Sequence, residues 1–436
     1  MIARRRGAFA VSVALVLPVL LAGCGSQVKP GSAAHAGATT PASPTPPTPT
    51  PTPPTPTAPW PTTPSPTAFP STGSPASPTP TALPVAAALR CATAAVDAMP
   101  ATLRAGQLLM AGVPIADPSS GASLVRADLL GGVFLVGRTV TTPSAVATQL
   151  GVLQRAAREA TGVPLLVAAD QEGGKIQALR GTGFGTMASA LQQGALDETA
   201  LRAKARQWAA GLAVAGVNLD LAPVADTVPA GFARRNPPIG ALDRQFGSSP
   251  ERVAGHVAAF VAGARESGVL TTVKHFPGLG RVTKNTDFSP SVVDSQTTVD
   301  DPDLRPFAAG IRAGAGAVMV SSAIYRKIDP DRQAVFSRAV IEGLLRRRLG
   351  YDGVVMTDDV GSAVAVRSVA PGQRAVLFVR SGGDLVLTVD PTQAAAMRSA
   401  LIAEASTSPS FARRVTQSAT RIVALKAAAG LLPCGA

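Results

Sequence analysis

Eight short apolar runs, separated by stretches with helical patterning, dominate the chain after residue 106. Because the runs are apolar without interruption, they predict parallel strands buried on both faces of a sheet, and the intervening stretches predict the helices that cover it. The runs cover residues 107–113, 131–137, 164–170, 218–226, 270–276, 317–323, 353–359 and 384–389. Eight such units predict an α/β fold, a closed (β/α)8 TIM-like barrel, with an open doubly wound sheet as the alternative.

The first 24 residues have a different pattern, that of an export signal. Three arginines (residues 4–6) precede an apolar stretch over residues 8–22, which is too short for a membrane-spanning helix. The sequence LAGC, which ends at Cys24, resembles a bacterial lipobox, in which the cysteine is lipidated after cleavage. We therefore predict a lipoprotein signal peptide over residues 1–23 and a lipid anchor on Cys24. An ordinary secretory signal with an unmodified Cys24 is the alternative.

Residues 24–85 are rich in Pro, Thr and Ser and contain few hydrophobic residues. Such a segment cannot bury enough apolar surface to offset its chain entropy, so we expect a disordered tether. The folded domain then comprises residues 86–436. Its two cysteines, Cys91 and Cys434, lie near opposite ends of this domain, and an exported protein favours a disulfide between them. Two free buried thiols are the alternative.

The chain is basic, with a formal net charge of +13 from 40 Lys and Arg against 27 Asp and Glu. Surfaces that bind nucleic acid usually combine a basic stripe with aromatic residues that stack on bases. Here the basic residues are scattered and aromatic residues make up 4% of the chain. We therefore expect no nucleic-acid partner, and attraction to anionic polymers of the cell envelope instead.

Polar residues follow the apolar part of five predicted strands. They are Asp170, Asp226, Lys274, His275, Ser321, Ser322, Asp358 and Asp359. One or two such residues usually cap the next helix, but five strands that end in this way exceed what capping requires. Because the active site of a (β/α)8 barrel lies at the carboxyl ends of its strands, we expect these side chains to converge on one pocket.

The residue types in this predicted pocket limit its chemistry. The chain's histidines are His35, His256 and His275, which leave no zinc ligand set, and the sequence contains neither a Gly-x-Ser-x-Gly motif nor a Walker-type phosphate loop. We expect no metal and no cofactor. Carboxylates together with basic side chains favour glycosyl chemistry, in which one carboxylate attacks the anomeric carbon and a second group protonates the leaving oxygen.

Five motifs occur in an order and at a spacing that indicate a known family. They are DQEGGKIQALRG (170–181), LDLAPVAD (219–226), DRQFG (243–247), TVKHFPGLG (272–280) and GVVMTDD (353–359). With these motifs, residues 100–430 resemble the bacterial β-N-acetylglucosaminidases of glycoside hydrolase family 3. The resemblance implies a single-domain (β/α)8 barrel that removes terminal N-acetylglucosamine, commonly from peptidoglycan fragments, by a retaining two-step route.

The same resemblance implies roles for residues of this chain. The family's nucleophile corresponds to Asp358, with Asp359 in a supporting role. The family's sugar-binding positions, where charge would strengthen the hydrogen bonds to sugar hydroxyl groups, correspond to Asp170, Arg244, Lys274 and His275.

The loop after the Lys-His pair departs from the family pattern. Leu279 stands where the family has a histidine, and Asn285 and Asp287 replace the aspartate and histidine of its acid/base dyad. In one interpretation Asp287 is itself the acid/base, its pKa raised by enclosure and by the neighbouring Asp358. In the other, the proton relay is lost, and the protein binds sugars or peptidoglycan with weak hydrolysis or none.

A further departure is Ala178, where many relatives have an arginine that contacts the substrate; Arg180 could substitute for it. Together these features predict a retaining exo-glycosidase that hydrolyses terminal β-N-acetylglucosaminides of cell-wall fragments through a covalent intermediate on Asp358. We expect a monomeric lipoprotein on the extracytoplasmic face of the cell membrane. A β-glucosidase is less favoured, because typical β-glucosidases of the family have a second sandwich domain.

Overall fold

The computed structural model describes residues 85–432 and residue 434. Within them, eight strands form one sheet in which neighbouring strands run parallel. Their order along the sheet is β14-β11-β9-β8-β4-β2-β1-β15. The strands are Leu109–Pro114 (β1), Gly132–Val136 (β2), Leu166–Ala169 (β4), Leu219–Asp220 (β8), Leu270–Phe276 (β9), Ala317–Val320 (β11), Val354–Thr357 (β14) and Val386–Thr388 (β15).

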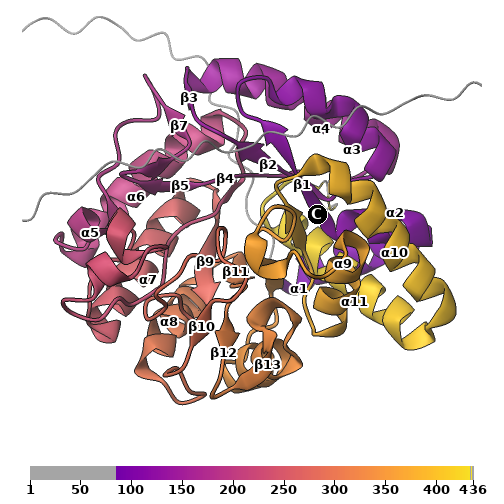
Figure 1. Ribbon diagram of the computed structural model, residues 1–436. Coiled ribbons are helices and arrows are strands. Elements are labelled where there is room, and N and C mark those ends of the chain that lie inside the picture. Colours follow the sequence, from indigo (N-terminus) through magenta and orange to yellow (C-terminus); the bar gives the residue numbers. More distant parts are fainter. Residues whose placement is uncertain (1–84, 433, 435–436) are drawn as a thin grey trace, which may run out of the picture. The chain divides into compact units, whose positions relative to one another are not determined.

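The two ends of this sheet meet, so the barrel closes between β14 and β15. Met356 and Leu385 form a parallel bridge. The Thr357 N–H donates to the Leu385 carbonyl at 3.0 Å, and the Val360 N–H donates to the Leu387 carbonyl at 3.0 Å. The predicted (β/α)8 barrel is therefore confirmed, and the alternative of an open doubly wound sheet is wrong. Each predicted strand overlaps one strand of the barrel (Figure 1).

One predicted strand is much longer than the strand observed. The run 218–226 is extended and paired as β8 over Leu219–Asp220. Its remainder is irregular chain, with a cis peptide before Pro223 and a single parallel bridge between Val224 and Lys274. Pro223 has no N–H to donate to a neighbouring strand, which limits the ladder at this point.

Helices follow the barrel strands and lie on the outside of the sheet (Figure 1). In chain order they are α3 (Ala122–Asp128), α4 (Pro143–Thr161), α6 (Glu198–Val214), α7 (Pro250–Glu266), α8 (Arg305–Ala313), a π-helical segment (Ala339–Arg348), α9 (Pro371–Arg380) and α10 (Ala394–Thr407). The described chain also has α1 (Val85–Asp97), α2 (Ala101–Gln107), the short α5 (Ala190–Gln193) and α11 (Pro409–Ala428). Local sequence explains several helix starts: the Asp197 carboxylate, for example, caps α6 by accepting the Ala200 N–H at 2.8 Å.

The strands are buried on both faces, as the uninterrupted apolar runs predicted. Five valines from five different strands are fully buried: Val133, Val167, Val273, Val318 and Val355. Their β-branched side chains pack the barrel interior and the layer between the strands and the helices. The interior is therefore a packed core, and a ligand can reach the barrel at its ends.

The loops that follow the strands form three small sheets at the carboxyl end of the barrel. The pairs are β3 (Thr139–Val140) with β7 (Leu179–Arg180), β5 (Gln171–Gly173) with β6 (Ile176–Gln177), and β12 (Ile324–Tyr325) with both β10 (Val293–Asp294) and β13 (Asp329–Gln333). These ladders fix the chain segments that follow β2, β4, β9 and β11. We call the carboxyl ends of the eight strands, with these loops, the barrel mouth.

At the opposite end of the barrel, a fully buried aspartate connects the last strands and helices. Asp384, just before β15, accepts hydrogen bonds from Arg346 at 2.5 Å, Arg414 at 2.7 Å and the Ser418 hydroxyl at 2.9 Å. It also accepts the Val355 N–H at 2.9 Å. Because a buried carboxylate is costly unless it is paired and hydrogen-bonded, this network is a structural element of the barrel.

The first and last helices of the described chain pack against each other and are linked covalently. Cys91, in α1, forms a disulfide with Cys434, which follows α11, and their Cα atoms are 5.8 Å apart. The disulfide that the sequence favoured is present, so the alternative of two free thiols is wrong. The bond spans 343 residues of sequence and therefore encloses every strand of the barrel.

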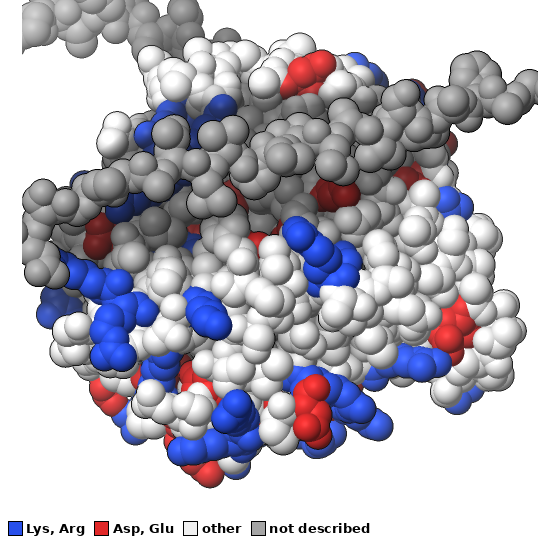
Figure 2. Space-filling model, in the orientation of Figure 1, with Lys and Arg blue, Asp and Glu red and all other residues white. Residues whose placement is uncertain are grey.

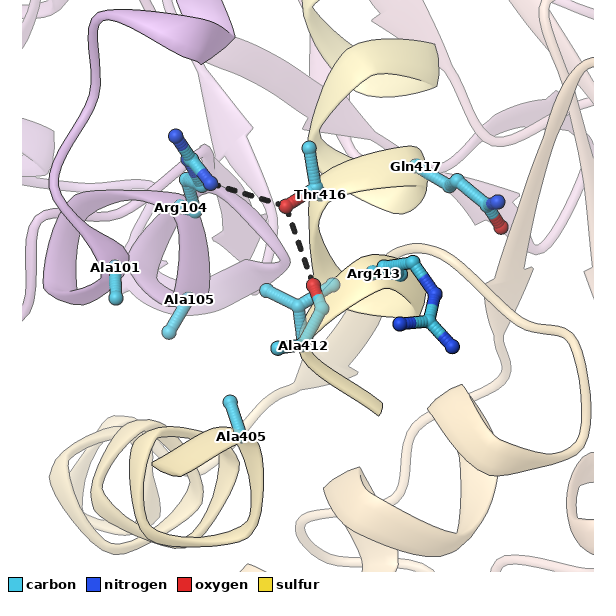
Figure 3. A pocket seen from close by; sticks show the side chains of 9 residues that line it. Ala101, Arg104, Ala105, Ala405, Ala412, Arg413, Thr416 and Gln417 are labelled. Atoms are coloured by element: carbon cyan, nitrogen blue, oxygen red, sulfur yellow. Dashed lines mark hydrogen bonds between the residues drawn. The ribbon is translucent and has the colours of Figure 1, made fainter. Parts of the chain in front are cut away.

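One hollow in the surface contains none of the predicted site residues. It has a volume of about 390 Å³ and lies between α2, α10 and α11, and four of its nine lining residues are alanines. Within this lining, Arg104 donates to the Thr416 hydroxyl at 3.1 Å (Figure 3). Lys and Arg side chains form several separate groups on the face in Figure 2. Among the residues that the structure describes, no helix has the length and apolar character needed to cross a bilayer.

We predict that Cys91→Ser lowers the free energy of unfolding by about 2–5 kcal/mol, because the unfolded chain regains the entropy that the disulfide removes. Denaturant unfolding of the oxidised wild type and the variant measures this loss. Cys434→Ser and the reduced wild type are matched controls and should lose the same amount. An unfolding midpoint that reduction leaves unchanged would contradict the prediction.

Candidate active site

The first part of the site is an ion cluster that joins the ends of β4 and β9. Asp170 directly follows β4, and Lys274 lies within β9. The Lys274 Nζ is 2.6 Å from Asp170 Oδ1 and 2.6 Å from Glu172 Oε1. The side chain of Lys274 is 3% exposed and that of Asp170 is 33% exposed. Asp170 is therefore the accessible member of the pair, with the ammonium group held behind it.

Glu172 lies at the centre of this cluster, although the sequence analysis assigned it no role. The Arg244 guanidinium donates to both of its carboxylate oxygens, at 2.8 and 2.7 Å, in the bidentate geometry that strengthens such pairs. Burial by itself would raise the pKa of Glu172, but the charges of Arg244 and Lys274 outweigh it and lower the pKa to about 2. The one sequence signal for Glu172 was its place in the DQEGG motif, two residues after Asp170.

The two cations of the cluster are stabilised in return. Burial would lower the pKa of Lys274, but Asp170 and Glu172 outweigh this effect and raise it. Burial would likewise lower the pKa of Arg244, and Glu172 raises it. Asp220, in β8, is a third carboxyl group nearby. Burial raises its pKa, and the positive charge of Lys274 offsets only part of this shift. The cluster thus holds two protonated cations at the barrel mouth.

His275, the neighbour of Lys274 in β9, is held between Arg244 and Asp226. Its Nδ1 is 2.7 Å from Asp226 Oδ2, its backbone N–H donates to Asp226 Oδ1 at 3.2 Å, and its Nε2 is 3.3 Å from Arg244 Nη2. Asp226 Oδ1 also accepts the Leu279 N–H at 2.7 Å. Asp226 therefore orients the ring and fixes the start of the following loop. Its place at a strand end indicated a polar pocket residue but did not reveal this function.

Asp358 and Asp359 directly follow β14 and make different contacts. The Asp358 N–H donates to the Val320 carbonyl of β11 at 3.0 Å, and Asp358 Oδ1 accepts the Asp359 N–H at 2.9 Å. The carboxylate of Asp359 accepts hydrogen bonds from the backbone N–H groups of Gly361 and Val389, both at 2.8 Å. Asp359 therefore fixes the loop after β14 to the end of β15, which holds Asp358 in position at the barrel mouth.

Asp287 reaches the site because the loop after β9 is hydrogen-bonded to the loop after β14. The Val364 N–H donates to the Asp287 carbonyl at 3.2 Å, and the Ala365 N–H donates to the Thr286 carbonyl at 3.0 Å. The Asp287 N–H donates to Asn285 Oδ1 at 2.9 Å, which shapes the turn. These contacts bring Asp287 into the neighbourhood of the end of β14.

The carboxyl groups of Asp358 and Asp287 interact electrostatically. Burial is the largest cause of the raised pKa of Asp358. The charge of His275 lowers this pKa, and the charge of Asp287 raises it further. Lost hydration also raises the pKa of Asp287, although this residue is exposed at the surface of its loop, and His275 and Arg244 oppose that shift. Neighbouring carboxylates resist joint ionisation and retain one proton between them over part of the pH range.

The remaining sequence-based expectations fall outside this cluster. Arg180 donates to the Gly174 and Gln177 carbonyls at 3.0 and 3.1 Å, so its guanidinium stabilises the loop after β4. Ala178, next to it, is buried. Cys24, the signal peptide and residues 24–84 of the tether lie outside the described residues. Within residues 85–432 and 434, no group of three or more His, Cys, Asp or Glu side chains is arranged to hold a metal ion.

Cleavage of a glycosidic bond requires one ionised and one protonated group beside the anomeric carbon. The barrel mouth holds two interacting carboxyl groups next to fixed cations. This fold and site therefore indicate a glycoside hydrolase. The sequence of this chain matches a protein family described as the Glycosyl hydrolase family 3 N terminal domain, over residues 102–425. The chain belongs to glycosyl hydrolase family 3.

Individual relatives are similar over most of the domain. A Beta-hexosaminidase of Xylella fastidiosa is 39% identical over 273 residues, which cover 61% of this chain and 77% of that protein. The crystal structure of the β-N-acetylhexosaminidase of Beutenbergia cavernae has a TM-score of 0.74 and 49% identity, and the match covers 75% of this chain and 98% of that one. A family 3 β-N-acetylglucosaminidase of Paenibacillus sp. has a TM-score of 0.70 and 32% identity, over 77% of this chain and 63% of that one.

We predict that Glu172→Gln destabilises the protein in a pH-dependent way. The folded-state pKa of Glu172, about 2, lies below its ordinary value of 4.5, so the carboxylate stabilises the fold above pH 4.5 and this contribution is lost as the pH falls toward 2. The shift corresponds to roughly 3 kcal/mol. Denaturant unfolding of wild type and variant should show a difference that is largest above pH 4.5 and shrinks toward pH 2.

Glu159→Gln is the control for this experiment, because Glu159 forms an exposed pair with Arg126, and such pairs contribute little to stability. Its unfolding free energy should follow that of the wild type throughout the pH series. A Glu172→Gln difference that is constant from pH 7 to pH 2 would show that the ion cluster does not depend on this carboxylate.

Proposed function

We propose that the protein is a retaining exo-β-N-acetylhexosaminidase, which releases terminal N-acetylglucosamine through a covalent intermediate on Asp358. The observation that carries the proposal is that hydrogen bonds join the loop of Asp287 to the loop that follows Asp358, at the barrel mouth that also holds Asp170, Lys274 and Arg244. The electrostatic interaction of Asp358 with Asp287 agrees with this arrangement. The β-hexosaminidase names of the relatives support the choice of sugar.

In the first step, a carboxylate oxygen of Asp358 bonds to the anomeric carbon while the glycosidic C–O bond breaks. Asp287 gives its proton to the departing oxygen, so the aglycone leaves as a neutral alcohol and Asp287 becomes ionised. Burial raises the pKa of Asp358, while His275, the Asp359 N–H and Lys274 oppose this shift and favour its ionised form. In the proposed mechanism Asp287 carries the proton that the leaving group needs.

In the second step, a water molecule attacks the same carbon from the side that the aglycone vacated. Asp287 accepts a proton from this water, the bond between the sugar and Asp358 breaks, and both carboxyl groups return to their starting states. Two inversions at the anomeric carbon give net retention of configuration. The raised pKa of Asp287 suits a group that must act as an acid and then as a base.

The ion cluster binds the sugar in this proposal. The accessible carboxylate of Asp170 accepts from hydroxyl groups of the sugar, and Lys274 and Arg244 donate to its hydroxyl oxygens through charge-assisted hydrogen bonds, beside the His275 ring. Glu172 fixes the positions of the two cations by neutralising them from the buried side. The cations are therefore held in place before the substrate arrives, which reduces the entropy cost of binding.

The natural substrate and location of the enzyme are also part of the proposal. We infer that it acts on N-acetylglucosamine-containing peptidoglycan fragments as a monomer anchored through Cys24 at the outer surface of the cell membrane. The signal sequence, the LAGC motif and the Pro- and Thr-rich segment support export and anchoring. Mass spectrometry of the protein purified from its own membrane tests the lipid on Cys24.

We predict that Asp358→Ala lowers kcat/KM on an aryl N-acetyl-β-glucosaminide by about 10³-fold or more, because the covalent route is lost. A slow-turnover fluorosugar should label Asp358 in the wild type, and peptide mass spectrometry locates the adduct. Asp352→Ala, which removes an exposed carboxylate that precedes β14 at the opposite end of the barrel, is the control and should retain full activity. A wild type with neither turnover nor adduct would refute the proposed function.

We predict that Asp287→Ala lowers kcat/KM by about 10²- to 10⁴-fold on a disaccharide, whose leaving group needs a proton, and much less on a dinitrophenyl glycoside, whose leaving group does not. The fall in wild-type kcat/KM as the pH rises through the pKa of the acid should also disappear in the variant. Steady-state kinetics across a pH series measure both effects. Equal losses on the two substrates would exclude Asp287 as the acid.

A second candidate function is sugar binding without efficient hydrolysis. Leu279 and Asn285 favour it, because they stand where the resembled family has two members of its proton-transfer loop. Calorimetry that detects binding of N-acetylglucosamine by a protein with no turnover on either substrate would support this candidate. Turnover that depends on Asp287 would exclude it.

A further inference from the structure

Phe288 is an apolar side chain exposed next to the proposed acid. It is 79% exposed and is the one aromatic residue among the large hydrophobic residues that are exposed in the described part of the chain. Aromatic residues are few in this sequence, at 4%, and most of the others in the described chain, such as Phe276 and Phe307, are buried. Phe288 therefore contributes little to the core, so packing does not explain its presence at this position.

The backbone of its loop fixes where Phe288 lies. The Phe288 N–H donates to the Asn285 carbonyl at 3.2 Å, which closes the turn that carries Asp287. The carbonyls of Thr286 and Asp287 accept hydrogen bonds from the loop after β14. Phe288 is therefore held at the barrel mouth by the same contacts that hold Asp287, and its Cα is about 3.8 Å from that of the acid.

The position of the acid defines which part of the substrate is nearby. An acid that protonates the glycosidic oxygen must lie on the side of the leaving group, because the nucleophile attacks the anomeric carbon from the opposite side. Phe288 is carried by the same turn as this acid and is exposed beside it. An exposed aromatic face offers the apolar C–H surface of a sugar ring a contact that charged neighbours such as Lys284 do not.

We propose that Phe288 forms the aglycone subsite of this enzyme, a platform on which the first sugar of the leaving group packs. The inference rests on the proposed function, which sets which end of the substrate faces Asp287. It adds a determinant of specificity, because the enzyme would select a pyranoside leaving group over a small one. The terminal N-acetylglucosamine is bound by the ion cluster, whereas Phe288 contacts the next sugar ring.

The test measures binding separately from turnover. In an Asp358→Asn background, calorimetry compares N-acetylglucosamine with its β-1,4-linked disaccharide, N,N′-diacetylchitobiose. Phe288→Ala should weaken disaccharide binding by about tenfold and leave monosaccharide binding unchanged. Phe288→Tyr keeps the aromatic face and should restore disaccharide binding. Val214→Ala is the control, because Val214 is 65% exposed at the end of α6, which precedes β8 and so lies at the end of the barrel opposite the mouth.

Kinetics with Asp358 intact give a second readout. Phe288→Ala should raise KM for the disaccharide by about tenfold with kcat nearly unchanged, the pattern expected when binding is lost equally in the ground and transition states. N-acetyl-β-glucosaminyl fluoride has no aglycone ring, so its kcat/KM should not change.

The outcomes distinguish this inference from the function on which it rests. Equal binding of the disaccharide by wild type and Phe288→Ala, or an equal loss for the monosaccharide and the disaccharide, would overturn the platform. A selective loss for the disaccharide in a protein that hydrolyses neither substrate would support the platform while refuting the hydrolase.

Discussion

Charge compensation by Glu172 is the interaction on which the candidate site depends. Two cations, the buried Lys274 and the mostly buried Arg244, lie at the barrel mouth, and their burial would be costly without a carboxylate between them. Glu172 pairs with both and has a pKa low enough to keep its charge. The arrangement leaves Asp170 accessible on one side and positions Arg244 against His275 on the other. The donors and acceptors of the candidate site are therefore already oriented by their own contacts.

The barrel brings residues that are far apart in the sequence to one mouth. Its closure between β14 and β15 brings Asp358, near the end of the chain, to the same mouth as Asp170. Hydrogen bonds between the loops then bring in Asp287. Asp384 and the Cys91–Cys434 disulfide act at the opposite end and on the outer helices, where they stabilise the barrel without contact with the reacting groups.

Strand positions and strand-end residues were predictable from sequence because they depend on local patterns. Continuous apolar runs gave all eight strands, and the polar residues that follow them included Asp170, Lys274 and Asp358. Arg244 was identified by family resemblance alone, since it follows no strand. Glu172 was missed because its importance comes from Arg244 and Lys274, which are far away in the sequence and carry no periodic signal.

By itself, the sequence determined the fold class, the end of the barrel at which polar groups gather, and the replacement of the family's acid/base dyad by Asn285 and Asp287. These features follow from hydrophobic periodicity and residue identity, which are local. The tertiary structure decided which charged groups pair and that Asp287 lies where it interacts with Asp358. Electrostatic interactions and burial depend on distances through space, and those distances are set when the sheet closes and the loops bond to one another.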